Sequence, residues 1–385
     1  MNNIVYYSSL IFTDCDFPLI REFQQKGVKV YYYIEVVTNR CCLGLFDLSP
    51  YKDKIGIHKA SDFKEFNFYN KYLDLENVFL VFRSPKLTDV RNWKTYYGLC
   101  RKIIKQNPDV FHFTNPLGVS ESFLYYFWKK MVLTVHDPFL HSGHESRINS
   151  IKRRFAFKLV PKLVLLNNKQ ANKFCDTYKI SDSHIYFNKL GVYTCLNYIY
   201  EQTNNSAKSR EPYILYYGFI APYKGIDVLC KAMELVHQRF PEIRCIIAGK
   251  GKLYFDYSTY KDVNYIKLEN RFIFVDELVS LISNSQFVVC PYKDATQSGV
   301  VSSCFAFVKP VVATNVGGLG ESIIDDVTGK LVNRNDPSEL AEAIIQLYLS
   351  PDKIKEYSQN IKKIFWKGDR EWSAIVNKYL LIWFC

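Results

Sequence analysis

The sequence has no long apolar run, no cysteine framework and no tract of low complexity. A membrane-spanning helix needs about 18 or more uncharged apolar residues, and no such run occurs. The nearest candidate, residues 122–135, is interrupted by Lys129 and Lys130. The first residues also lack the basic stretch and apolar stretch of a secretory signal. We therefore expect a cytoplasmic protein that does not span a membrane.

The eleven cysteines are scattered along the chain. Only Cys41 and Cys42 are adjacent, and no cysteine lies in a Cys-x-x-Cys pair or near a histidine at zinc-ligand spacing. Reduced and mostly buried thiols fit this pattern. The sequence thus predicts no metal site and no bound cofactor.

Positive charge is concentrated in the first half of the chain. The net charge of the 385 residues is +12, of which residues 1–200 carry +11. A basic half favours an anionic partner, although basic surfaces are also common in soluble proteins. No motif for binding RNA or DNA accompanies this charge, so we expect no nucleic acid partner.

One predicted helix of the first half is both basic and amphipathic. Its basic residues are Arg147, Lys152, Arg153, Arg154 and Lys158, and its apolar residues are Ile148, Ile151, Phe155 and Leu159. Such a helix can lie on an anionic bilayer, or it can bury its apolar side in the protein. With the charge of this half, we favour peripheral contact with the inner face of the cytoplasmic membrane.

The first half alternates predicted strands and helices. The strands are short β-branched or aromatic runs, apolar almost throughout, as in a parallel sheet that is buried on both faces. They are predicted at 3–8, 28–34, 78–82, 110–114, 131–136, 162–167 and 184–190, with helices such as 18–26 and 93–106 between them.

The pattern restarts after a polar stretch, 201–211, which is the best linker candidate. Strands are predicted at 213–217, 244–248, 264–267, 286–291 and 310–314, and a helix at 227–240. Asp336, Pro337 and Glu339 have the order of a helix start, with Asp336 as the cap. Two βαβ series predict an α/β protein of two doubly wound domains. We place them at 1–195 and 212–370, with a linker at 196–211 and a C-terminal helix at 371–385.

Three turns of the second half carry the candidate chemistry. The first runs from Gly218 to Lys224 between a strand and an amphipathic helix. Glycine permits close approach of a ligand, and lysine supplies a point charge for a phosphate. An exposed lysine that is merely solvated is the alternative explanation.

The second turn contains Gln297, Ser298 and Gly299, and a helix is predicted to begin near Ser298. The free N–H groups of a helix N-terminus suit a diphosphate, although Ser298 could instead be an ordinary cap. The third turn, 315–321, is rich in glycine. All three turns would meet at one edge of the sheet.

These motifs together resemble the family-4 group of GT-B glycosyltransferases. The resemblance rests on YYGFIAPYKGIDVLCKAM, IIAGKGK, FVVCPYKDATQSGVVSSCFAFVKPVVATNVGGLGESI and TGKLVNRNDPSELAEAI. In the first half, DVFHFT and VLTVHDPF resemble acceptor-domain strands of the family, and KLGVY resembles its domain-closing segment. The implied fold is GT-B, in which two Rossmann-like domains face each other across a cleft.

The resemblance also implies roles for individual residues. Lys224 would bind the donor diphosphate, the backbone of Ser298, Gly299 and Val300 would hold its distal phosphate, and His136 would lie near the transferred sugar. The residues that would line the nucleotide pocket are Gly218, Gly249, Gly251, Asp276 and Glu277.

Some positions depart from the family pattern. Phe219 stands where members usually carry arginine, and Ala295 and Ser303 stand where they usually carry two glutamates. The usual sugar and ribose contacts are therefore in doubt, and Gln297 and Ser303 are our candidate replacements.

The resemblance implies a retaining transferase that uses a UDP- or GDP-sugar without a metal. We expect its acceptor to be a glycan or a lipid-linked glycan of a cell-surface polysaccharide. Two alternatives remain open, namely a nucleotide-sugar 2-epimerase of the same fold and a non-catalytic nucleotide-sugar-binding protein.

Overall fold

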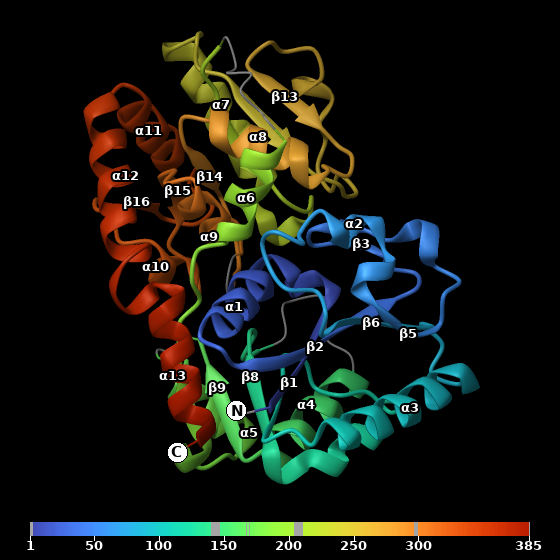
Figure 1. The fold of residues 1–385 in the computed structure, drawn as a ribbon. Coiled ribbons are helices and arrows are strands. Elements are labelled where there is room, and N and C mark those ends of the chain that lie inside the picture. The colour runs from blue at the N-terminus through green and yellow to red at the C-terminus, as the bar shows by residue number, and fades with distance from the viewer. Residues whose placement is uncertain are drawn as a thin grey trace. The chain divides into compact units, whose positions relative to one another are not determined.

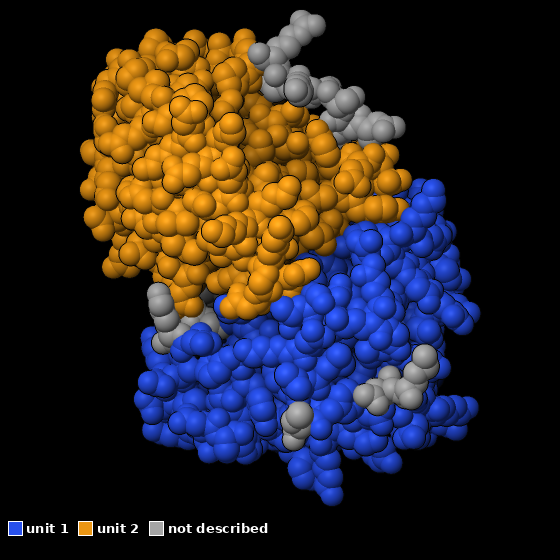
Figure 2. Space-filling model, turned by 60° about the vertical axis from the view of Figure 1, so that its left-hand side comes forward, with its two compact units in different colours: residues 1–190, 372–385 blue, residues 191–371 orange. Residues whose placement is uncertain are grey.

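The chain forms two compact units in the computed structural model, which describes residues 3–139, 147–166, 168, 170–203, 211–295 and 299–384 (Figure 1). Unit 1 comprises Met1–Leu190 and Trp372–Cys385, and unit 2 comprises Gly191–Glu371 (Figure 2). The chain therefore enters unit 2 a few residues before the predicted end of the first domain at 195.

Unit 1 is built on an eight-stranded sheet in the order β10-β9-β8-β7-β1-β2-β6-β5. Its neighbouring strands are parallel, except that β5 runs antiparallel to β6. The strands are β1 (Asn3–Ser9), β2 (Lys29–Val37), β5 (Gly56–Lys59), β6 (Val78–Arg83), β7 (Val110–Phe113), β8 (Met131–Val135), β9 (Lys162–Leu165) and β10 (Ile185–Phe187). The seven predicted strands are confirmed to within a few residues, whereas β5 and the small hairpin of β3 (Cys42–Leu43) and β4 (Phe46–Asp47) were not predicted.

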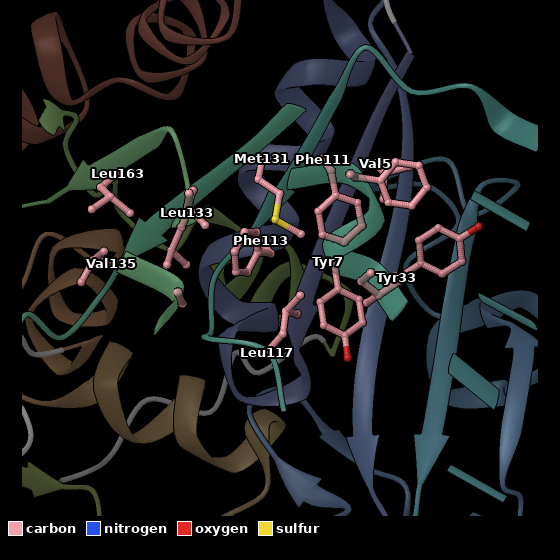
Figure 3. Packing of buried hydrophobic residues seen from close by; sticks show 14 of the residues in the cluster. Val5, Tyr7, Tyr33, Phe111, Phe113, Leu117, Met131, Leu133, Val135 and Leu163 are labelled. Carbon is pink, nitrogen blue, oxygen red and sulfur yellow. The ribbon is translucent and has the colours of Figure 1, made fainter. Parts of the chain in front are cut away.

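Helices cover both faces of this sheet because its strands are apolar on both sides. On one face, Tyr7, Tyr33 and Phe111 enter a core with residues of α3, η4, α4 and α5 (Figure 3). Adjacent residues of a strand point to opposite faces, so Tyr6 and His112 lie on the other face, where His112 contacts the ring of Tyr379 in α13. The bounds are α1 (Thr13–Gln25), α3 (Val90–Gln106), η4 (Ser122–Lys130), α4 (Arg147–Leu159), α5 (Ala171–Tyr178) and α13 (Trp372–Phe384).

Unit 2 has a six-stranded parallel sheet in the order β13-β12-β11-β14-β15-β16. The strands are β11 (Ile214–Tyr217), β12 (Cys245–Ala248), β13 (Ile266–Glu269), β14 (Val288–Cys290), β15 (Val311–Thr314) and β16 (Gly329–Val332), of which only β16 was not predicted. Within the unit this order is 3-2-1-4-5-6, that of a dinucleotide-binding sheet. The direction of winding reverses between β11 and β14.

The predicted helices of unit 2 are present. In α7 (Ile226–Arg239), Val228, Leu229 and Met233 are buried, as the helical spacing predicts. In α11 (Pro337–Tyr348), the Asp336 side chain accepts a hydrogen bond of 2.9 Å from the Glu339 N–H, so Asp336 is the cap. The other helices are α6 (Thr194–Gln202), α8 (Val275–Asn284), α9 (Gly299–Ala306), α10 (Leu319–Ser322) and α12 (Pro351–Phe365).

The range predicted as a linker, 196–211, needs correction. Its first residues continue α6, which packs against α8 and α9 and buries Leu196 and Ile199. Residues 204–210 lie outside the described part of the chain. No helix among the described residues is long and apolar enough to cross a bilayer.

Candidate functional site

The candidate site of unit 2 lies where the winding of its sheet reverses. The loop after β11 contains Gly218 and Lys224, and the loop after β14 leads to α9. In open α/β sheets, ligands bind beyond the carboxyl ends of the strands at this reversal. The topology therefore brings together the first two turns that the sequence singled out.

Gly225 holds these two loops against each other. Its φ is +67°, and a Cβ atom there would lie 1.9 Å from the carbonyl oxygen of Pro291. No larger side chain fits this contact without movement of the backbone. Gly225 thereby fixes Lys224, its neighbour in the chain, beside the loop that follows β14.

The Lys224 side chain is half-buried, and its ammonium has no acidic partner among the described residues. Its Nζ lies 3.7 Å from the ring centroid of Tyr292, and no hydrogen bond or ion pair joins it to another described residue. Burial lowers the pKa of Lys224 to about 8. By contrast, the Nζ of Lys293 lies 2.6 Å from a carboxylate oxygen of Asp227. A partly desolvated cation without a counter-ion is stabilised when an anion binds beside it.

The N-terminus of α9 is the second positive element of this site. Gly299 and Val300 are its first residues, and their N–H groups have no partner within the helix. A Cβ on Gly218 would lie 4.0 Å from Val300 Cγ2, and one on Gly299 would lie 3.0 Å from the Tyr193 hydroxyl oxygen. Gln297 and Ser298 lie outside the described residues.

Ser303 lies one turn from the N-terminus of α9. It is buried, and its hydroxyl donates a hydrogen bond of 2.8 Å to the carbonyl oxygen of Gly299. The hydroxyl proton is thus used within the helix, which leaves the oxygen as an acceptor. The contact of Ser303 with the ribose stays a prediction.

The predicted nucleotide pocket begins at the carboxyl end of β12. The φ of Gly249 is +156°, and a Cβ there would lie 1.8 Å from the carbonyl oxygen of Gly218. The Gly251 N–H donates a hydrogen bond of 3.1 Å to Asn270 Oδ1. Glycine at 249 and 251 therefore lets the loops after β11 and β12 pack closely, and the nucleotide contact of these glycines stays a prediction.

The two acids of α8 lie in its first turn. The Glu277 carboxylate accepts hydrogen bonds from both terminal nitrogens of Arg271, one of them at 2.8 Å, and Arg271 Nε also donates to Glu269. Glu277 is therefore part of an ion cluster at the surface. Asp276 precedes it in the same turn.

The third glycine-rich turn joins the second turn directly. The Gly318 N–H donates a hydrogen bond of 3.3 Å to the carbonyl oxygen of Ala295. Ala295 itself is buried, so a glutamate side chain would not fit there unchanged. The three turns thus meet at one edge, as predicted.

In unit 1, His136 follows β8 at the carboxyl edge of the sheet. Its ring stacks on Phe12 with the centroids 4.2 Å apart, and its buried Nε2 has no hydrogen-bond partner in the described part of the chain. Burial lowers the pKa of His136 to about 4, so the ring is neutral near pH 7. A neutral imidazole can exchange a hydrogen bond with a sugar hydroxyl.

The same edge of unit 1 contains a buried polar network that the sequence did not reveal. The Tyr7 hydroxyl donates a hydrogen bond of 2.7 Å to Glu121, and its oxygen lies 3.1 Å from that of Tyr96. Tyr96 in turn donates to Glu35, which pairs with Arg83. Its members are tens of residues apart in the chain, and only the topology brings them together.

The structure therefore brings together four predicted site residues, namely Lys224, Gly218, Gly299 and Val300. Tyr193 and Tyr292 also lie at this site, and the sequence did not predict them there. The conspicuous aromatic content of the sequence was the only signal for these two tyrosines. Among the described residues, no group of three potential metal ligands occurs. Transfer without a metal stays a prediction.

Comparison with known proteins agrees with this description. Residues 211–350 match the family model described as "Glycosyl transferases group 1". An uncharacterized glycosyltransferase of Methanocaldococcus jannaschii is 34% identical over 152 residues, which cover 39% of this chain and 42% of the relative. A D-inositol 3-phosphate glycosyltransferase of Paenarthrobacter aurescens is 33% identical over 147 residues, 35% of each chain. The matched region thus spans less than half of these curated relatives.

The fold is similar along nearly the whole chain. A glycosyltransferase from Rickettsia africae aligns with a TM-score of 0.65 at 17% identity, covering 99% of this chain and 97% of that one. HepE of Anabaena in complex with UDP and glucose aligns with a TM-score of 0.67 at 14% identity, covering 99% of both chains. The chain therefore has the GT-B fold, and its residues 211–350 are similar to the group 1 glycosyltransferases.

Proposed function

We propose that this protein is a retaining glycosyltransferase. It transfers a sugar from a UDP- or GDP-sugar to a hydroxyl of a glycan or a lipid-linked glycan in the synthesis of a cell-surface polysaccharide. The observation that carries this proposal is the half-buried Lys224, without an acidic partner among the described residues, at the reversal of a 3-2-1-4-5-6 sheet. Related folds have been solved with UDP and with UDP-glucose, as in HepE of Anabaena.

Lys224 and the N-terminus of α9 would stabilise the departing diphosphate. Cleavage of the bond to the sugar leaves negative charge on the phosphate oxygens and an oxocarbenium-like sugar. A fixed cation and fixed N–H groups in a site with little water stabilise that charge most strongly in the transition state. Since Ala295 and Ser303 stand where the family usually carries glutamates, we propose attack by the acceptor hydroxyl on the face that the diphosphate leaves. A phosphate oxygen would take the proton of that hydroxyl.

The structure shows no disulfide among the ten described cysteines, which favours a reducing compartment. Together with the basic charge of unit 1, this supports a cytoplasmic location at the inner face of the membrane. His136 of unit 1 would contact the transferred sugar as a neutral hydrogen-bonding group.

A panel of UDP- and GDP-sugars in thermal unfolding tests the donor site first. A true donor at about one hundred times its Kd should stabilise the protein by about 2.7 kcal/mol, and K224A should lose that response. Slow release of UDP or GDP from the stabilising compound would then indicate a transferase. Binding without any release would favour a non-catalytic protein, release of a 2-epimer would favour the epimerase, and a product of inverted anomeric configuration would exclude the retaining mechanism.

A further inference from the structure

The outer surface of unit 1 over α3, η4 and α4 is unusually uniform in charge. The 17, 9 and 13 residues of these elements include Lys94, Arg101, Lys130, Arg154 and other basic residues but no aspartate or glutamate. All three elements lie on the same side of the sheet, where their inward residues share one apolar core. The opposite side of these elements therefore presents mainly positive charge, although Arg91 pairs with Asp89 just before α3.

The exposed face of α4 is also apolar. Ile148, Ile151 and Phe155 are 55%, 67% and 55% exposed, and their spacing of three and four residues places them on one side of the helix. The residues that α4 buries are instead Ala156 and Phe157. The explanation that this apolar side is buried in the protein is therefore wrong for these three residues.

Cations flank this apolar stripe. Successive residues of a helix are about 100° apart, so Arg147, Arg154 and Lys158 lie along one border of the stripe. All three are exposed. Arg153, in contrast, points inward and donates hydrogen bonds to the carbonyl oxygens of Asp137 and Pro138. The inward cation anchors the helix, and the outward cations leave their charge in solvent.

The surface continues from α4 onto η4 and α3. The ring of Phe155 packs against that of Tyr125 in η4, with the two centroids 5.2 Å apart. The ring of Phe123 in η4 packs against that of Tyr97 in α3, with the centroids 5.7 Å apart. In η4, Tyr126 and Trp128 are exposed beside Lys129 and Lys130. Tyrosine and tryptophan favour the interface between water and lipid, because their rings are apolar and carry one polar group. We call the exposed residues of α3, η4 and α4 the basic-aromatic surface.

We propose that the basic-aromatic surface docks on an anionic lipid bilayer, with Ile148, Ile151 and Phe155 inserted between the headgroups. The cations would approach the lipid phosphates, and transfer of the apolar side chains out of water would stabilise the bound state. Nucleic acid would use the charge and the rings but has no apolar layer to receive two isoleucines. The inference deepens the proposed function by naming its membrane partner, and it depends on that function only for the identity of the acceptor.

Vesicle sedimentation with the full chain tests the proposal without any nucleotide. The probes are vesicles of phosphatidylcholine alone and of phosphatidylcholine mixed with phosphatidylglycerol. Wild type should bind the mixed vesicles at least about tenfold more tightly, with lower affinity at high salt. I151S/F155S should weaken this binding about tenfold, and R147Q/R154Q/K158Q should weaken it by more. These side chains are exposed, so the variants should unfold at the temperature of wild type.

Matched controls test whether the loss of any exposed cations, or of any exposed apolar side chain, would weaken binding to the vesicles. K355Q/K362Q/K363Q removes three exposed cations from α12 of unit 2. L349S removes an exposed leucine between α11 and α12. Both should bind the mixed vesicles within about twofold of wild type. K224A should also bind them normally, and I151S/F155S should still release UDP or GDP. A failed donor site and a failed membrane surface are thereby distinguishable.

Equal binding of wild type to both kinds of vesicle would overturn the proposal. So would unchanged binding by I151S/F155S, because lipid insertion requires those side chains. If a mixed-sequence RNA displaces the protein from vesicles and binds I151S/F155S as tightly as wild type, the surface is a nucleic acid site instead.

Discussion

The carboxyl edges of the two sheets differ in whether their charged side chains have partners within the protein. In unit 2, the edge is made of glycine turns and the start of a helix, and its half-buried cation, Lys224, has no acidic partner among the described residues. In unit 1, the carboxylates of Glu35 and Glu121 are bonded to Arg83 and Tyr7. The first edge thus has a cation available for an anionic ligand, whereas each carboxylate of the second already has a partner in the protein. The comparison teaches that a binding site can be recognised by a charge that the fold leaves unpaired.

The largest effect is expected from K224A. Removal of one preorganised cation should lower kcat for donor cleavage by about 100- to 1,000-fold. The free energy of unfolding should stay about the same, because Lys224 has no ion pair or hydrogen bond within the described residues to lose. Release of UDP or GDP and thermal unfolding measure the two quantities. K231A, an exposed lysine on α7, is the control, and an equal loss of stability and turnover in K224A would contradict the assignment.

G225A tests whether the close contact with Pro291 positions the lysine. The added Cβ would meet the Pro291 carbonyl in a backbone of positive φ, which should cost at least about 2 kcal/mol more than left-handed strain alone. G368A is the matched control, since its φ is +75° and no atom lies within 4 Å of the added Cβ. Denaturant unfolding of both variants measures the difference. Equal stability of the two would show that the loops can separate at little cost.

H136A should lower turnover without a comparable loss of stability. A neutral ring that hydrogen-bonds the sugar would contribute about 2 kcal/mol, or about 30-fold in kcat/KM. His237 is a matched control, because it also stacks on an aromatic ring, that of Tyr265, and also has a buried nitrogen without a partner. H237A should affect stability alone. If both variants behave alike, His136 is structural.

The pH dependence of donor binding should report the unpaired lysine. Lys224 is protonated below its pKa of about 8, and a bound diphosphate favours the charged form. Affinity should therefore be constant below pH 8 and fall by up to about tenfold per pH unit above it. Calorimetric titration of the protein with UDP or GDP at several pH values measures this affinity. K224R should bind with a flat profile, since the guanidinium stays charged.

The smallest effect is expected from E121Q in the paired edge. Burial first, and Glu35 second, raise the pKa of Glu121 to about 7. Because the folded form holds the proton more tightly than the unfolded form, this group lowers stability as pH rises from about 4.5 to about 7. E121Q should remove that decline, because the amide does not ionise, and urea unfolding at several pH values measures the effect. E76Q, an exposed glutamate, should leave the decline unchanged.

Most of the fold follows from local sequence patterns. Apolar strands such as 131–135 and the cap at Asp336 are local features, so the twelve predicted strands and the helix start were found. The donor edge was also predictable, because Gly218, Lys224 and Gly299 lie in turns that a backbone-based phosphate site requires. Strands β5 and β16 were missed because they are short and lack a continuous apolar run.

What the sequence could not provide depends on distant contacts. The cation–π contact of Lys224 with Tyr292 and the Tyr7–Glu121 bond join residues from separate turns and strands. The direction in which α4 faces is another case, because its amphipathic spacing fits a buried stripe and an exposed one equally well. Only the packing of Phe157 inward shows which side meets solvent.

The return of α13 to unit 1 has a consequence for the order in which the protein can fold. The ring of Trp383 stacks on that of Phe23, with the centroids 4.7 Å apart. The hydroxyls of Tyr379 and Thr134 are hydrogen-bonded, and the Asn188 side chain donates a hydrogen bond to the Ile375 carbonyl oxygen. Unit 2 is continuous in the chain and can be completed during synthesis. Unit 1 must wait with part of one sheet face uncovered until α13 has left the ribosome.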